Sequence, residues 1–220
     1  MKERLGILGG TFDPVHRGHV RAAIEVADAL GLSRVLMIPA ARPPHKPGFE
    51  PAPAAHRLAM LELAAREDPR LTPCAIELKR KGPSYTVDTL EELAGKLPGA
   101  AFFLILGSDA YREIDTWHRP QRLLELADIV VVRRPGCAGS ERREPPVAAR
   151  ALCCYDPAID GYVHQSGHRI VFQPIQGVEV SATEVRERVA RGLPITELTG
   201  PEVARYIAQH GLYRRASEHA

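Results

Sequence analysis

The chain has 220 residues, of which 45% are hydrophobic and 25% charged, a composition typical of a globular protein with one sizeable core. Its 29 basic and 27 acidic residues nearly balance, which excludes a global attraction to nucleic acid or to an anionic membrane. Any anion-binding site must therefore be local.

No apolar segment approaches the ~20 residues of a membrane span, and the amino terminus lacks the pattern of a signal peptide. The four cysteines, at positions 74, 137, 153 and 154, form no C-x-x-C pair. That spacing favours reduced thiols over a zinc site or a disulfide framework. We therefore expect a cytoplasmic protein without a membrane segment.

Short apolar runs alternate with helix-like segments along the chain. The first strand is expected over residues 5–8, and apolar residues at helical spacing then predict a helix over 16–30 that stops at Gly31. The further expected strands are 35–38, 74–78, 101–106, 128–132 and 170–172, and the further helices are 54–66, 86–97, 120–127, 182–191 and 201–210.

The run AFFLIL at 101–106 is continuously apolar, as in a parallel strand that is covered on both faces. The alternation of strands and helices predicts an α/β fold with a Rossmann-like, doubly wound, mostly parallel sheet and helices on both faces. We expect a single domain over 1–213, with C-terminal helices in 181–213, an irregular excursion from the sheet over 136–168 and a tail at 214–220.

Unusual residues follow four of the expected strands. They are Gly9, Gly10 and Thr11 after the first strand, 39–46 after the second, Gly107, Ser108 and Asp109 after AFFLIL, and Arg133 and Arg134 after DIVVV. Because ligands bind outside the carboxyl ends of strands in open α/β sheets, these positions predict one shared site.

The stretch GGTFDPVHRGH at 9–19 places His16 and His19 on one face of the first helical turn. Free amides and the helix dipole favour an anion there, so two imidazole donors beside a glycine turn favour a phosphate cradle. Zinc is the competing chemistry, but no neighbouring cysteine or acidic residue completes a ligand set. Packing is the other alternative for each histidine, and the glycine pair by itself predicts only a tight turn.

These residues carry a resemblance to a known family. GGTFDPVHRGH resembles the H-x-G-H signature of the nucleotidyltransferase superfamily, and VSATEVR at 180–186 resembles its second motif. The chain departs from the pattern at Ala182, where a second serine is frequent, and it matches poorly over 136–168. The stretches that are similar to the bacterial nicotinate-nucleotide adenylyltransferases are PPHK at 43–46, HRLAML at 56–61, YTVDTL at 85–90, GSDAYREIDTWHRP at 107–120, RRPG at 133–136 and YIAQHGLY at 206–213.

The resemblance implies adenylyl transfer from ATP to nicotinate mononucleotide, which gives deamido-NAD and pyrophosphate in NAD biosynthesis. The attacking phosphate has a second pKa of about 6 and is largely a dianion at pH 7, so the reaction needs positioning and positive charge rather than a protein nucleophile. Mg²⁺ is expected mainly on the ATP phosphates, without dedicated metal-binding residues in the protein. The implied partners are the two substrates, with neither nucleic acid nor membrane, and no oligomeric state is predicted.

The implied site has three sets of residues. The catalytic set is His16, His19, Lys46 and Arg186. The ATP-binding set is Gly9, Gly10, Thr11, Phe12, His16, His19, Gly107, Asp109, Ser181, Thr183 and Arg186. The set that binds nicotinate mononucleotide is Lys46, Tyr85, Thr86, Trp117 and Arg134.

Several of these residues have simpler alternatives. Trp117 is the only tryptophan, and it is either the ring that stacks on the pyridine or a core anchor. Asp109 either accepts from a ribose hydroxyl or caps a helix. Ser181 and Glu184 have the spacing of a capping box, an alternative that makes Thr183 and Arg186 incidental surface residues.

Three functional alternatives stay open. A phosphopantetheine adenylyltransferase is the nearest enzymatic rival, although YTVDTL and the Trp117 stretch argue against it. A class I aminoacyl-tRNA synthetase shares a similar histidine motif, but this chain is too short for one. A nucleotide-binding regulatory module that has lost catalysis is the rival from another class, and the presence of His16, His19 and Arg186 argues against it.

Overall fold

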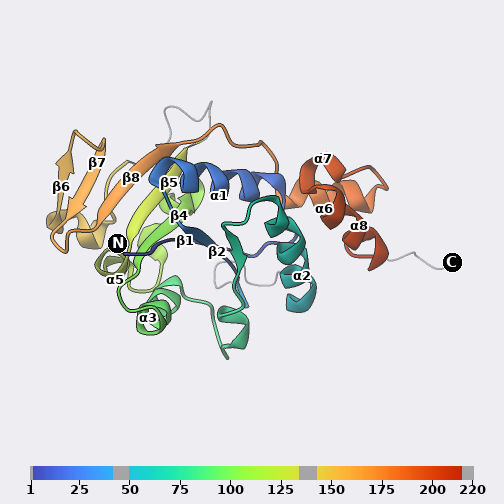
Figure 1. Ribbon diagram of the computed structural model, residues 1–220, viewed down its shortest axis with the longest axis horizontal. Helices are drawn as coiled ribbons and strands as arrows, with labels where there is room; N and C mark the ends of the chain where they lie inside the picture. Colours follow the sequence, from blue (N-terminus) through green and yellow to red (C-terminus); the bar gives the residue numbers. More distant parts are fainter. Residues whose placement is uncertain (1, 42–49, 134–142, 215–220) are drawn as a thin grey trace.

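The computed structural model describes residues 2–41, 50–133 and 143–214. Its central element is one eight-stranded sheet in the order β3-β2-β1-β4-β5-β8-β7-β6 (Figure 1). The strands from β3 to β8 in this order run parallel, and β7 and β6 form an antiparallel hairpin at the end of the sheet. The strands are β1 (Arg4–Gly10), β2 (Arg34–Pro39), β3 (Leu71–Pro73), β4 (Ala101–Gly107), β5 (Asp128–Arg133), β6 (Cys153–Asp156), β7 (Gly161–His164) and β8 (Arg169–Pro174).

Helices cover both faces of this sheet, and α6, α7 and α8 gather at the end of the molecule opposite β6 and β7 (Figure 1). The α-helices are α1 (Arg17–Leu30), α2 (Ala54–Ala64), α3 (Thr86–Lys96), α4 (Ser108–Arg112), α5 (Pro120–Leu126), α6 (Ala182–Ala190), α7 (Thr196–Thr199) and α8 (Pro201–Gln209). Short 3₁₀ helices are η1 (Ala65–Glu67), η2 (Glu77–Lys79), η3 (Ile114–Thr116) and η4 (Val147–Leu152). The predicted Rossmann-like α/β architecture is confirmed.

The strands divide their apolar residues between two cores. In β4, Leu104 packs in the core beneath α3 and α5, whereas Ile105 packs in the core beneath α1, α2 and α8. Successive side chains of a strand point to opposite faces, so a strand covered on both faces has no polar alternation. This explains why AFFLIL is continuously apolar.

The predicted strand over 74–78 is wrong. The sheet contains β3 instead, which ends at Pro73, and Glu77–Lys79 forms the 3₁₀ helix η2. Cys74 and Ile76 pack in the core beneath α3. This short apolar run therefore forms a turn, and its side chains pack beneath a helix instead of joining the sheet.

The predicted irregular excursion over 136–168 is wrong for its second half. The hairpin of β6 and β7 extends the sheet through β8, with Cys153 opposite His164 and Asp156 opposite Gly161. β6 forms the edge of the sheet and is half-buried to exposed, whereas β7 lies between β6 and β8 and has the buried residues Gly161 and His164 at its ends. Both strands have only four residues and include polar ones, so they lack the apolar run that revealed the central strands. Residues 134–142 and most of the predicted tail lie outside the described residues.

Within the described ranges, no helix combines the length and apolar character that a membrane crossing requires. Cys74, Cys153 and Cys154 are free thiols in the described part of the chain. Cys137 lies outside the described residues.

Candidate functional site

The chain switches sides of the sheet between β1 and β4. It adds β2 and β3 on one side of β1 and then crosses to place β4 on the other side. The pairing of β1 with β4 ends at Ile7 opposite Leu104, so the last residues of the two strands separate. A cleft of about 410 Å³ opens between these strand ends. This is the crevice in which open α/β sheets bind their ligands.

Two glycines keep the floor of the cleft open. Gly9 and Gly107 line it from the ends of β1 and β4, and a Cβ at either position would meet no protein atom within 4 Å. Gly18 has a different role, because a Cβ there would lie 3.0 Å from His16 Nδ1 and 3.1 Å from the Val178 carbonyl oxygen. The glycine of the H-R-G-H stretch therefore suits the close approach of α1 to the segment before α6, where a Cβ would be tightly packed.

The two histidines lie one behind the other at the start of α1. His16 is the N-cap residue, 5% exposed, so the helix begins at Arg17 rather than at His16 as predicted. The His19 ring lines the cleft and stacks on His16 with centroids 3.7 Å apart. The backbone N–H of His16 donates to His19 Nδ1 at 3.3 Å, so a neutral His19 ring carries its proton on Nε2.

The cleft brings together residues from both substrate sets of the prediction. They are Gly9, Gly10, Thr11, His19, Thr86, Gly107 and Trp117. Their sequence separation shows that strand order, rather than local spacing, assembles the lining.

Other predicted residues lie outside the lining. Phe12 is buried behind His19, with ring centroids 4.9 Å apart, and the Tyr85 ring packs on His118 at 4.6 Å. Asp109 is exposed on α4, where it forms an ion pair with Arg112. Lys46 and Arg134 lie outside the described residues.

The distal motif begins α6. Ser181 is its N-cap, and its hydroxyl accepts from the Glu184 backbone N–H at 3.1 Å, as the capping alternative predicted. Arg186 Nη2 donates to Thr183 Oγ1 at 3.3 Å, and Nη1 donates to the Asp13 carbonyl oxygen at 2.6 Å. Arg186 therefore contacts the loop that follows β1, although 173 residues separate it from Asp13.

Glu77 lines the cleft, and the sequence interpretation missed it. It is 7% exposed and accepts from Thr89 Oγ1 at 2.8 Å. Burial raises the pKa of Glu77, while hydrogen bonds from Thr89 and Ser84 and the charge of Arg80 oppose that rise. A lone acidic residue within the apolar stretch CAIEL was the available signal, but a strand was expected there.

The Glu77 contacts fix the approach to α3. Thr89 lies one turn into the helix that begins at Thr86, and Ser84 Oγ accepts from the Ala41 backbone N–H at 3.0 Å. The turn before Thr86 is therefore tied both to a buried carboxylate and to the residue that follows β2.

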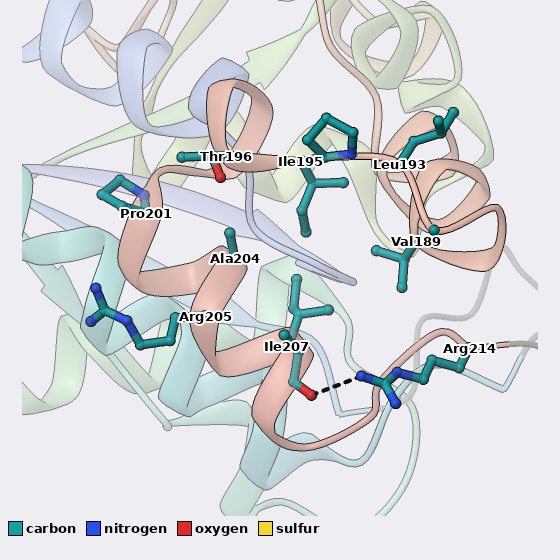
Figure 2. Close-up of a pocket in the computed structure, with 12 residues that line it drawn as sticks. Val189, Leu193, Ile195, Thr196, Pro201, Ala204, Arg205, Ile207 and Arg214 are labelled. Atoms are coloured by element: carbon teal, nitrogen blue, oxygen red, sulfur yellow. Dashed lines mark hydrogen bonds between the residues drawn. The ribbon is translucent and has the colours of Figure 1, made fainter.

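A second hollow, of about 570 Å³, lies among α6, α7 and α8 (Figure 2). Apolar side chains such as Ile195 and Ala204 line it, together with Arg205 and Arg214. Among the described residues of its lining there is none of the predicted site residues and no histidine, cysteine or carboxylate. The side chains suited to nucleotide chemistry gather instead at the cleft between β1 and β4.

Comparison with known proteins gives three findings. A cytidylyltransferase-like family model matches residues 7–188. A curated relative from Syntrophotalea carbinolica is 42% identical, over 96% of this chain and 97% of the relative. A relative from Thermus thermophilus is 41% identical, over 96% of this chain and 100% of the relative. Both are named as probable nicotinate-nucleotide adenylyltransferases. The solved Plasmodium falciparum nicotinic acid mononucleotide adenylyltransferase complexed with NaAD superposes with a TM-score of 0.72 at 16% identity, over 96% of this chain and 97% of that one. This likeness shows a shared fold.

Proposed function

The chain belongs to the cytidylyltransferase-like family and, within it, to the nicotinate-nucleotide adenylyltransferases, and on this premise we propose that adenylyl transfer takes place in the cleft between β1 and β4. The enzyme transfers the adenylyl group of ATP to nicotinate mononucleotide in NAD biosynthesis and yields deamido-NAD and pyrophosphate. The observation that carries the assignment of the site is the convergence of His19, Thr86 and Trp117 on one cleft at the switch point of the sheet.

The ATP half of the site is built on the loop after β1. Gly9 and Gly107 leave room for the nucleotide beside the backbone, and His19 supplies an Nε2–H donor for a phosphate oxygen. The start of α1 adds the positive end of a helix dipole. Arg186 adds charge from α6, and its contact with Asp13 supports this role.

Further members of the ATP half are assigned from the motifs. Gly10, Thr11 and Phe12 shape the loop, and His16 stacks behind His19. Ser181 and Thr183 stand at the start of α6, where a capped helix still presents amides to an anion. Asp109 is assigned as the acceptor for a ribose hydroxyl, and that hydrogen bond would compete with the ion pair between Asp109 and Arg112.

The acceptor half lies on the other wall. Thr86 is the first residue of α3, so unpaired amides of that helix end suit the carboxylate of nicotinate better than a neutral amide. Trp117 lines the same cleft and offers an aromatic face to the pyridine ring. Tyr85 immediately precedes the helix. Lys46 and Arg134, outside the described residues, keep the phosphate and acceptor roles that the family resemblance implies.

The chemistry follows from charge. An oxygen of the mononucleotide phosphate attacks the α-phosphorus of ATP and forms a new P–O bond, while the bond from that phosphorus to the bridging oxygen of pyrophosphate breaks. The attacking phosphate is already largely a dianion, so no side chain has to remove a proton. His19 and Arg186 stabilise the charge that develops on the departing pyrophosphate, and the cleft holds the two anions together.

We assign Mg²⁺ to the ATP phosphates. Within the described ranges, no three histidine, cysteine, aspartate or glutamate side chains are grouped so that they could hold a metal ion. Mg²⁺ retains several waters and is commonly bound through substrate phosphates, where it would neutralise charge on the triphosphate. The free thiols of Cys74, Cys153 and Cys154 support a cytoplasmic location, and the single sheet from β1 to β8 supports one domain over 1–213.

Pyrophosphate release from ATP tests this function. Nicotinate mononucleotide, nicotinamide mononucleotide and phosphopantetheine are compared as acceptors, with ATP alone as the blank. We expect the highest kcat/KM with nicotinate mononucleotide, because a helix end favours its carboxylate. The fluorescence of Trp117 should respond to this acceptor more than to ATP. Equal kcat/KM for the acid and the amide would refute the role assigned to the start of α3.

A further inference from the structure

A polar cluster, buried at its centre, lies where the loop after β1 meets the last described residues. We call Asp13, Arg57, Arg186 and Tyr213 the Asp13 cluster. Asp13 is 3% exposed, and its Oδ1 accepts from the Tyr213 hydroxyl at 2.7 Å and from the Ala52 backbone N–H at 3.0 Å. Its carbonyl oxygen accepts from Arg186 Nη1 at 2.6 Å. One residue thus joins the carboxyl-terminal segment to the arginine of the distal motif.

Arg57 holds the same loop from the other side. It is 1% exposed and donates to the carbonyl oxygens of Thr11 at 2.7 Å, Ala40 at 2.8 Å and Ala52 at 2.9 Å. Burial lowers the pKa of Arg57, and the nearby Asp13 opposes that effect. The loop containing Thr11 and Asp13 is therefore fixed at its backbone by one buried guanidinium.

Tyr213 is held in a conformation that its own backbone does not favour. Its φ is 62°, and Phe12, beside Asp13, has φ 50°. Non-glycine residues keep such angles only where their surroundings impose them. Burial and the Asp13 carboxylate raise the pKa of the Tyr213 hydroxyl, so it stays protonated and donates. The observed bond to Asp13 is one contact that holds Tyr213 in place, across 200 residues of sequence.

The function described above leaves Tyr213 without a role. The Asp13 carboxylate lies 3.9 Å from Arg186 Nη1, in addition to the direct bond that this nitrogen makes to the Asp13 carbonyl oxygen. A shift of Asp13 would therefore move the support of Arg186. We propose that Tyr213 is a positioning residue: its hydroxyl fixes Asp13, and Asp13 holds Arg186 in the place from which it serves the ATP phosphates. This inference rests on the function proposed for Arg186.

The substitution Tyr213→Phe tests the proposal, since it removes only the hydroxyl. Tyr206→Phe is the matched control, because the Tyr206 hydroxyl pairs with His56 Nδ1 at 2.9 Å, away from Asp13. The Tyr213 bond reaches a charged group, so we expect kcat/KM for ATP to fall about tenfold in Tyr213→Phe. KM for nicotinate mononucleotide should stay within about twofold, and Tyr206→Phe should change neither value. A purely structural role would affect both substrates alike.

A double-mutant cycle identifies the residue through which Tyr213 acts. In an Arg186→Ala background, adding Tyr213→Phe should cause no further loss in kcat/KM for ATP, because the supported side chain is gone. Additive losses would overturn the proposal, and so would unchanged ATP kinetics in Tyr213→Phe. The function fails separately, if the wild-type enzyme releases no pyrophosphate from ATP and nicotinate mononucleotide. Thermal melts of every variant ensure that folded proteins are compared.

Discussion

His19 carries the sharpest prediction for the reaction itself. Its ring lines the cleft, and its Nδ1 accepts from the His16 backbone N–H, so the donor nitrogen of the neutral ring is Nε2. Replacing the imidazole in His19→Ala removes a preorganised donor to the developing charge. Loss of one such donor typically lowers kcat by about 10²–10³, and we expect that range here.

The same substitution has a structural cost that can be worked out separately. His19→Ala deletes the acceptor for the His16 N–H, worth about 1 kcal/mol as a helix cap, and ring contacts with His16 and Phe12, worth about 0.5–1.5 kcal/mol. The free energy of unfolding should fall by roughly 2 kcal/mol. At about 2–4 °C per kcal/mol for a chain of this size, the melting temperature should fall by about 4–8 °C.

The substitution His19→Gln separates the two effects. Glutamine at the third helical position can accept from the N-cap backbone N–H, so it should recover about half of the lost melting temperature. It lacks the imidazole, so kcat should stay far below that of the wild type. Steady-state pyrophosphate release and differential scanning calorimetry measure the two quantities. If His19→Ala lowers the melting temperature but keeps kcat within about threefold of wild type, His19 is a structural residue and the reasoning is refuted.

Two further substitutions test the helix start and the buried carboxylate. Ser181→Ala removes the acceptor for the Glu184 N–H, so the unfolding free energy should fall by about 1 kcal/mol and the melting temperature by about 2–4 °C; an unchanged melting curve would argue against the cap. Burial raises the pKa of Glu77 in the folded protein, so the folded state binds this proton more tightly than the unfolded chain does. The unfolding free energy of the wild type should therefore fall relative to that of Glu77→Gln as the pH rises from about 4.5, the ordinary pKa of a glutamate, through the raised pKa. Urea titrations measure both free energies, and a difference between the two proteins that does not change with pH would contradict this.

Much of the fold was predictable because it depends on local patterns. The residues of β1 and α1 were recognised from an apolar run and from helical spacing, and Gly31 ends α1 with φ 58°, as a C-cap glycine does. The strands that were wrongly predicted or missed are those in which the local pattern does not reflect the surroundings in the folded protein. The segment 74–78 has a strand-like apolar run but packs as a turn beneath α3, and β6 and β7 are four-residue strands whose polar residues interrupt the apolar signal.

The cleft likewise contains residues that the sequence led us to expect and one that it did not. Gly9, Gly107, His19, Thr86 and Trp117 were expected at one site, because ligands gather at the carboxyl ends of strands, and all five line the cleft; their binding roles stay predictions. The buried carboxylate of the cleft was not predicted, since the single acidic residue of CAIEL was interpreted as part of a strand.

The sequence by itself determined where most of the strands and helices form and which strand ends carry the residues that we expect to bind phosphate, because propensity, capping and periodicity act over a few neighbouring residues. Only the tertiary structure decided that Glu77 lies in the cleft and that Asp13 joins Arg186 and Tyr213, 173 and 200 residues away. Those contacts depend on the order of the strands and on the packing of α6 and α8. Both depend on how the apolar residues of the whole chain are buried on the two faces of the sheet. A hydrogen bond between residues so distant has no local pattern, because it forms only after the whole chain has packed.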